Sequence, residues 1–119
     1  PPQEAPVRPA PADTRAQDLA AIDGALERYR DAFQRLDAAA LARVWPNMPA
    51  QQAQTFSSMR SYKLDIVNKQ VNLTGDTATV TCVRQIAARP EVGREQTASP
   101  RTVFSLRRSG SNWTIVNVQ

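Results

Sequence analysis

The residue types that most often carry catalytic or metal chemistry are scarce in this sequence of 119 residues. It contains no histidine, which excludes histidine-based acid–base catalysis and histidine-containing metal sites. The single cysteine, Cys82, lies in an apolar stretch and is predicted to be a small buried residue. One cysteine also excludes a disulfide within the chain. We therefore predict no catalytic residue, no metal site and no cofactor.

Tyr29 and Arg84 are the strongest remaining candidates for chemistry, with Asp31 or Asp65 as a carboxylate. Tyr29 falls in the apolar stripe of a predicted helix, where a core tyrosine with a bonded hydroxyl is the favoured interpretation. Both aspartates are expected to face solvent. Arg84 shares a strand face with Cys82, where a charge needs a partner. An ion pair at a sheet edge or dimer interface is favoured, and the alternative is an anchor for an anionic ligand.

One strongly amphipathic helix is predicted to position Tyr29. Thr14 with Gln17 three residues later fits a capping box, so the helix should begin near Asp13 or Thr14. Apolar residues then recur every three or four positions: Leu19, Ile22, Leu26, Tyr29, Phe33 and Leu36. Because polar residues fill the other positions, this stripe is expected to pack on a sheet.

Two short helices are predicted next, at residues 38–44 and 50–59. Asp37 can cap the first, and Trp45-Pro46 ends it because the residue before a proline avoids the α region. Pro49 suits the first turn of the second. An apolar cluster accompanies these helices, formed by Trp45, Met48, Phe56 and Met59. Closure of the core is its favoured role, and the alternative is a pocket for a small apolar ligand.

The remainder of the chain is predicted to form antiparallel strands. Residues 62–73 lead to Gly75-Asp76, a good two-residue hairpin turn, and residues 77–86 return. Residues 87–100 should form a long connection with some strand at its base. The last two strands carry Thr102, Phe104 and Leu106, then Trp113 to Val118. Three helices followed by antiparallel strands indicate an α+β domain with the helices on one face of a curled sheet.

The first residues have a different composition. Residues 1–12 hold five of the nine prolines and are interpreted as a Pro/Ala-rich linker, with one folded domain at residues 13–119. Because the chain starts Pro1-Pro2 without a methionine, we expect it to be a piece of a larger protein. The linker would then tether the domain to an upstream domain.

The distribution of charge and of apolar residues argues against two classes of partner, nucleic acids and the membrane interior. Net charge is +4, carried by thirteen arginines and two lysines, but no run of like charge exceeds two residues. The arginines are therefore predicted to lie on solvated faces, and no nucleic-acid partner is expected. No apolar run approaches the ~18 residues needed to span a bilayer, so we predict no direct membrane insertion by this segment.

The order of these motifs resembles the NTF2-like (SnoaL-like) superfamily over residues 14–119. The residues that carry the resemblance are Tyr29 and Phe33, Asp37-Ala-Ala-Ala-Leu41, Val44-Trp45-Pro46, the hairpin from Tyr62 through Gly75-Asp76 to Val80, and Gly110-Ser-Asn-Trp113-Thr-Ile-Val. The resemblance implies a cone with three N-terminal helices packed on a curled antiparallel sheet. Within the superfamily, the chain is most similar to domains tethered by Pro-rich linkers to bacterial membrane proteins, including serine/threonine kinases. Such a position would be extracytoplasmic.

Two functions of different classes are compatible with this resemblance. The leading hypothesis is a non-enzymatic accessory domain that binds a small apolar or anionic ligand, or self-associates, within a larger bacterial protein. The second is a small stand-alone enzyme, an isomerase, cyclase or hydratase, that uses Tyr29 and Arg84 in the cone. The superfamily hosts both classes, so the fold alone does not decide between them.

The predicted outer face of the sheet suggests how the domain would self-associate. If Val80, Phe104, Leu106 and Ile115 point inward, the outer face carries short β-branched residues and few charges. Its valines would be Val67, Val83, Val103, Val116 and Val118, among threonine and serine. Such a surface suits a flat sheet-on-sheet contact, and we predict a homodimer through this face.

Overall fold

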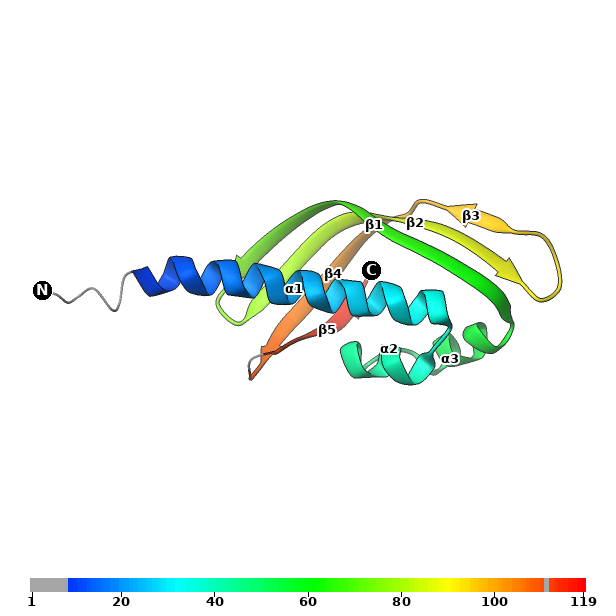
Figure 1. The fold of residues 1–119 in the computed structure, drawn as a ribbon, viewed down its shortest axis with the longest axis horizontal. Coiled ribbons are helices and arrows are strands. Elements are labelled where there is room, and N and C mark those ends of the chain that lie inside the picture. The colour runs from blue at the N-terminus through cyan, green and yellow to red at the C-terminus, as the bar shows by residue number, and fades with distance from the viewer. Residues whose placement is uncertain (1–8, 111) are drawn as a thin grey trace, which may run out of the picture.

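The computed structural model describes residues 9–110 and 112–119, with side chains described from Arg15 onward. Its elements are α1 (Pro9–Arg35), α2 (Ala38–Val44), α3 (Ala50–Ser57), β1 (Met59–Thr74), β2 (Thr77–Pro90), β3 (Gln96–Ala98), β4 (Arg101–Ser109) and β5 (Asn112–Val118). The strands form one antiparallel sheet in the order β1-β2-β4-β5, and β3 pairs with β2. Figure 1 shows the three helices on one face of this curled sheet, as predicted.

Helix α1 forms the long axis of the inner layer, and its apolar stripe is buried. Ile22, Leu26, Tyr29 and Phe33 are each at most 2% exposed. The helix begins at Pro9, four residues before the predicted start at Asp13, so Thr14 lies inside it. The capping box at Thr14 was therefore a wrong prediction of the helix start, and part of the predicted linker is helical.

The two short helices close one end of the domain. Asp37 caps α2 as predicted, because its Oδ1 accepts a hydrogen bond of 3.0 Å from the backbone N–H of Ala40. Pro49 is the residue before α3 instead of a member of its first turn. That helix ends at Ser57, and Met59 is the first residue of β1, which corrects its prediction as a helical residue.

The strands are longer than predicted and are bent by bulges. Gly75-Asp76 forms the predicted turn, with Gly75 at φ +58° and Thr74 opposite Thr77. A register shift interrupts β1 beside Asn68, which has φ +56°. A bulge bends a strand and increases its twist, and asparagine tolerates this backbone conformation better than most residues. The bend allows the β1–β2 ribbon to curve over α1 (Figure 1).

A second bulge changes the face on which Val118 lies. Ser105 is opposite Asn117, but Leu106 is opposite Ile115, so one additional residue, Val116, interrupts the pairing. Directly opposite residues share a face of the sheet. Val118 is opposite Phe104 and packs against the core, so its prediction as an outer-face residue was wrong.

The core lies between α1 and the concave face of the sheet. The predicted core residues are at most 2% exposed and belong to one cluster: Leu26, Phe33, Val80, Phe104, Leu106 and Ile115. Trp113 joins them from β5 and is 1% exposed. The predicted packing of the helix stripe on the sheet is thus confirmed.

An ion pair ties the first half of α1 to the far end of the sheet. Arg108 donates two hydrogen bonds to the Asp18 carboxylate, at 2.7 and 2.6 Å, and a third to Asp76 at 3.0 Å. Its guanidinium lies 4.9 Å from the centre of the Trp113 ring. The hydrogen bond from Arg108 is the main cause that lowers the pKa of Asp18. Asp18 is 6% exposed, so its charge depends on this partner.

Replacing Phe33 by alanine should lower the free energy of unfolding by ~3–5 kcal/mol, because a buried aromatic side chain would leave a cavity. Urea denaturation followed by circular dichroism measures this loss. Glu27→Ala, at an exposed position of the same helix, should change stability little. A loss below ~1 kcal/mol for Phe33→Ala would contradict the packing described above.

Asp18→Asn should lower the melting temperature at neutral pH by several degrees. A carboxyl whose pKa is lowered on folding stabilises the protein above its ordinary pKa of 3.8, and this contribution is lost as pH falls through the lowered pKa. The difference between variant and parent should therefore shrink in acid. Asp23→Asn, which removes an exposed carboxylate paired with Lys69, is the matched control. Equal melting temperatures for all three proteins at neutral pH would refute the role of the pair.

Candidate functional site

The first candidate site surrounds Arg84 on the concave face of the sheet. Strand alternation on β2 places Arg84 on the same face as Val80 and Cys82, as predicted, and its partner on β1 is Ile66. Unlike the apolar residues of this row, Arg84 brings a positive charge beneath α1. Its side chain is half-buried.

Two hydroxyl groups hold the Arg84 guanidinium in place. Its Nε donates a hydrogen bond of 2.8 Å to Thr102 Oγ1, and its Nη1 donates one of 3.1 Å to the Tyr29 hydroxyl. Thr102 Oγ1 in turn donates to the carbonyl oxygen of Pro100 at 3.2 Å. Both hydroxyl-bearing residues are at most 1% exposed. The orientation of Arg84 is thus fixed by buried groups on α1 and β4.

The positive charge of Arg84 has no carboxylate within 4.0 Å in the part of the chain that the structure describes. Asp31 pairs with Arg30 at 3.2 Å. Asp65 is exposed and opposite Gln85, next to Arg84 in the chain, so it lies on the other face of the sheet. Arg84 therefore has no ion pair within the described residues of one chain, and an ion pair across a dimer interface stays a prediction. A guanidinium has five N–H donors and two are used in the bonds above, which leaves three for a ligand or water.

The titratable groups near Arg84 are neutral at physiological pH. Burial raises the pKa of Tyr29 to about 12, although the charge of Arg84 opposes this shift. Burial also raises the pKa values of Tyr62 and Cys82, again against the effect of Arg84. The arrangement can therefore attract and orient an anion. None of these three side chains is poised to accept a proton near pH 7.

Aromatic side chains fill the space beside this charge. The ring of Phe33 lies 4.7 Å from Tyr29, 5.0 Å from Phe56 and 5.0 Å from Tyr62, measured between ring centres. Trp45 is 6.1 Å from Tyr29 and 8% exposed. Of the predicted pocket residues, Tyr29, Trp45 and Phe56 are brought together in the core.

The two methionines of the predicted pocket lie farther out. Met48 is half-buried and packs against the core cluster. Met59 is half-buried at the start of β1, opposite Pro90. Thr102 was predicted to point inward but not to contact Arg84, although a threonine in an otherwise apolar row of β4 is a signal for a buried hydrogen bond.

The second candidate site is the outer face of the sheet, which none of the helices in the described part of the chain covers (Figure 1). Val67 is opposite Val83, and Val103 is opposite Thr81, so these residues share this face. Val116, at the bulge in β5, is 38% exposed. Four of the five predicted outer-face valines, Val67, Val83, Val103 and Val116, thus remain candidates after the removal of Val118.

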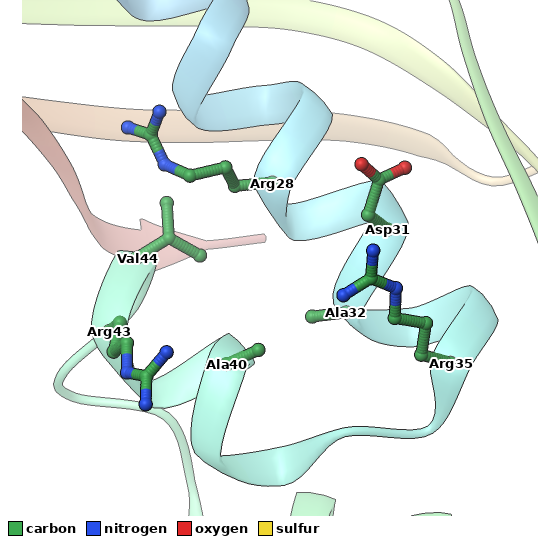
Figure 2. Close-up of a pocket in the computed structure, with 7 residues that line it drawn as sticks. All are labelled: Arg28, Asp31, Ala32, Arg35, Ala40, Arg43 and Val44. Carbon is green, nitrogen blue, oxygen red and sulfur yellow. The ribbon is translucent and has the colours of Figure 1, made fainter.

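Three arginines that were predicted only to be solvated line a groove between α1 and α2. Figure 2 shows Arg28 and Arg35 on α1, and Arg43 on α2, around this groove. Arg28 and Arg35 are seven residues apart, which places them on one face of a helix and is the signal that the sequence offered.

The described residues contain neither a membrane-spanning helix nor a cluster of metal ligands. No helix there combines the length and apolarity needed to cross a membrane. Among the same residues, no cluster of three or more histidine, cysteine, aspartate or glutamate residues could hold a metal ion.

Comparison with known families gives one match. Residues 52–119 match the family model described as calcium/calmodulin dependent protein kinase II association domain. The match covers α3 except for its first two residues, and all of the strands. No curated protein matches the chain.

Solved structures with the same fold come from several bacteria. A candidate scytalone dehydratase from Novosphingobium aromaticivorans has a TM-score of 0.80 at 14% identity, over 90% of this chain and 85% of that chain. An NTF2-like superfamily protein from Salmonella enterica has a TM-score of 0.72 at 12% identity, over 90% of each chain. A candidate aromatic ring hydroxylase from Novosphingobium aromaticivorans has a TM-score of 0.75 at 20% identity, over 87% of each chain. These likenesses show that the chain has the NTF2-like fold.

Proposed function

Because this chain belongs to the calcium/calmodulin dependent protein kinase II association domain family, we propose that it is a self-association domain. In this proposal, two copies pair through the outer faces of their sheets and thereby join the larger proteins that carry them. The name of the family supports association as the activity. The uncovered outer face of the sheet supports this face as the contact surface.

The observation that carries the proposal is the one-sided coverage of the sheet. An antiparallel sheet with one covered face usually has a polar second face. Here the centre of the second face carries Val67, Val83 and Val103. Short β-branched side chains on a broad sheet can pack against an identical surface without a large loss of side-chain entropy.

The tether belongs to the same proposal. Residues 1–12, the last four of which belong to α1, are rich in proline and alanine, a composition typical of semi-rigid spacers. We propose that this segment connects the domain to an upstream module of a bacterial protein, such as a membrane serine/threonine kinase. Pairing of the domains would then raise the effective concentration of one upstream module near another.

Val103→Lys should convert a dimer into a monomer without unfolding it, because two buried ammonium groups would oppose each other across the contact. Sedimentation velocity at micromolar concentration measures the mass, and circular dichroism reports the fold. Val92→Lys is the matched control, because Val92 is 90% exposed and lies outside the sheet. A monomeric parent at high concentration would contradict self-association. An unchanged dimer in a folded Val103→Lys variant would contradict the proposed face.

A second candidate function is binding of a small anion beside Arg84. It is supported by a half-buried guanidinium that has hydroxyl partners and no carboxylate among the described residues. Ligand sensing and self-association are compatible, because they use opposite faces of the sheet. An enzyme with Tyr29 as its general base is less well supported, because burial raises the pKa of Tyr29 to about 12 and keeps the side chain protonated near pH 7.

Arg84→Met should weaken the binding of a small carboxylate, with benzoate as the probe, by about tenfold or more, because a charge-assisted hydrogen bond is lost. Isothermal titration calorimetry at constant ionic strength measures this affinity. Arg89→Met removes an exposed arginine from the same strand and should leave the affinity unchanged. Equal affinities for the parent and both variants would rule out Arg84 as the anchor.

A further inference from the structure

The groove between α1 and α2 has the composition of an anion site. Its volume is about 270 Å³, and its floor is made of small side chains, Ala32, Ala40 and Val44. This volume is below the ~300–1,000 Å³ of pockets that enclose drug-sized ligands, so the groove suits a small group. The backbone N–H of Asp37 donates a bond of 2.9 Å to the carbonyl oxygen of Ala32, which fixes the connection between the two helices. The walls of the groove are therefore held in one arrangement.

The positive charges around this groove are not balanced locally. Arg28, Arg35 and Arg43 have no carboxylate within 4.0 Å among the described residues. Asp31 is the acidic residue of the lining, and its carboxylate is bonded to Arg30 at 3.2 Å. The lining of the groove thus contains three guanidinium groups and one carboxylate, and that carboxylate already has a partner.

A structural role explains part of this pattern but not all of it. Arg35 and Arg43 lie in the last turns of their helices, where cations stabilise the helix dipole. That effect does not require the two side chains to line the same groove. Figure 2 shows their guanidinium groups on opposite sides of the groove, with Ala32 and Ala40 between them, whereas Arg28 lies above Val44.

We propose that this groove binds a phosphate monoester or another small dianion of the same chemistry. Guanidinium groups match phosphate oxygens in bidentate geometry, and the arginines that line this groove place several such donors around a group bound there. The alanines of the floor leave room for the group. Arg28 adds a third positive charge at longer range. The site lies on the helical layer, so it is independent of the proposed outer-face contact.

Titration with phenyl phosphate, a soluble phosphate monoester, at constant ionic strength and followed by calorimetry, tests the proposal. Arg35→Gln and Arg43→Gln should each weaken binding by about tenfold, because each removes one charge-assisted contact. Arg60→Gln, at an exposed position on β1, should leave the affinity unchanged. Asp31→Asn should tighten binding, since it removes the negative charge from the lining. Arg43→Lys should fall between the parent and Arg43→Gln, because it keeps the charge and loses the bidentate geometry.

Three outcomes would overturn the assignment. The first is an absence of binding at millimolar phenyl phosphate. The second is an equal loss of affinity in Arg60→Gln and the groove variants, which would indicate a general charge effect. The third is a change in sedimentation mass in Arg35→Gln or Arg43→Gln, which would indicate that the groove receives another copy of the chain.

Vesicles of phosphatidylcholine with phosphatidic acid distinguish the sources of the phosphate group. A soluble ligand predicts that the protein stays in the supernatant when the vesicles are sedimented. If the parent protein sediments with the vesicles and the Arg35→Gln variant does not, the phosphate group belongs to a lipid headgroup. That result would overturn the assignment of a soluble ligand. Failure of Val103→Lys to dissociate a dimer would leave all of these results unaffected, so the two proposals can fail separately.

Discussion

The packing of α1 on the concave face of the sheet is the interaction on which the rest of the structure depends. The stripe that includes Ile22, Leu26, Tyr29 and Phe33 supplies the apolar surface that the curled strands cover. Bulges in β1 and β5 give the sheet the curvature that this contact needs. With all three helices on one side (Figure 1), the sheet has an inner face that packs on the core cluster and an outer face that no helix of the described residues covers.

This asymmetry determines what each face can do. On the inner face, Arg84 is the residue that does not fit an apolar core, and Tyr29 and Thr102 satisfy it only in part. A buried charge without a counterion is costly, so an anion that reached it would be stabilised. The outer face instead exposes apolar side chains to water, because Val67, Val83 and Val103 are only partly buried. A second copy would cover them at little entropic cost.

Much of this architecture could be predicted from the sequence because its signals are local. The stripe of α1, the Asp37 cap and the Gly75-Asp76 turn each depend on neighbouring residues. The position of Val118 could not be predicted, since a bulge that shifts the alternation by one residue leaves no mark in composition. Nor could the helical start at Pro9, because proline is compatible with both a linker and a first helical turn.

The sites were harder to predict than the fold, because they join residues that are distant in sequence. Arg84 was recognised as unusual on its strand, but its partners on α1 and β4 emerged only from the tertiary structure. The groove arginines belong to two helices whose relative placement no local pattern specifies. Arg108 was likewise predicted to be a solvated residue, although it holds Asp18 and Asp76 together.

The central claim is that a second copy covers the outer face of the sheet. Isotope-filtered nuclear Overhauser measurements on a mixture of labelled and unlabelled protein test it most directly. The account predicts intermolecular contacts from the methyl groups of Val83 and Val103, and none from Val80, which is 0% exposed in the core. Intermolecular contacts confined to α1 or α2, or none in a sample that sediments as a dimer, would contradict it.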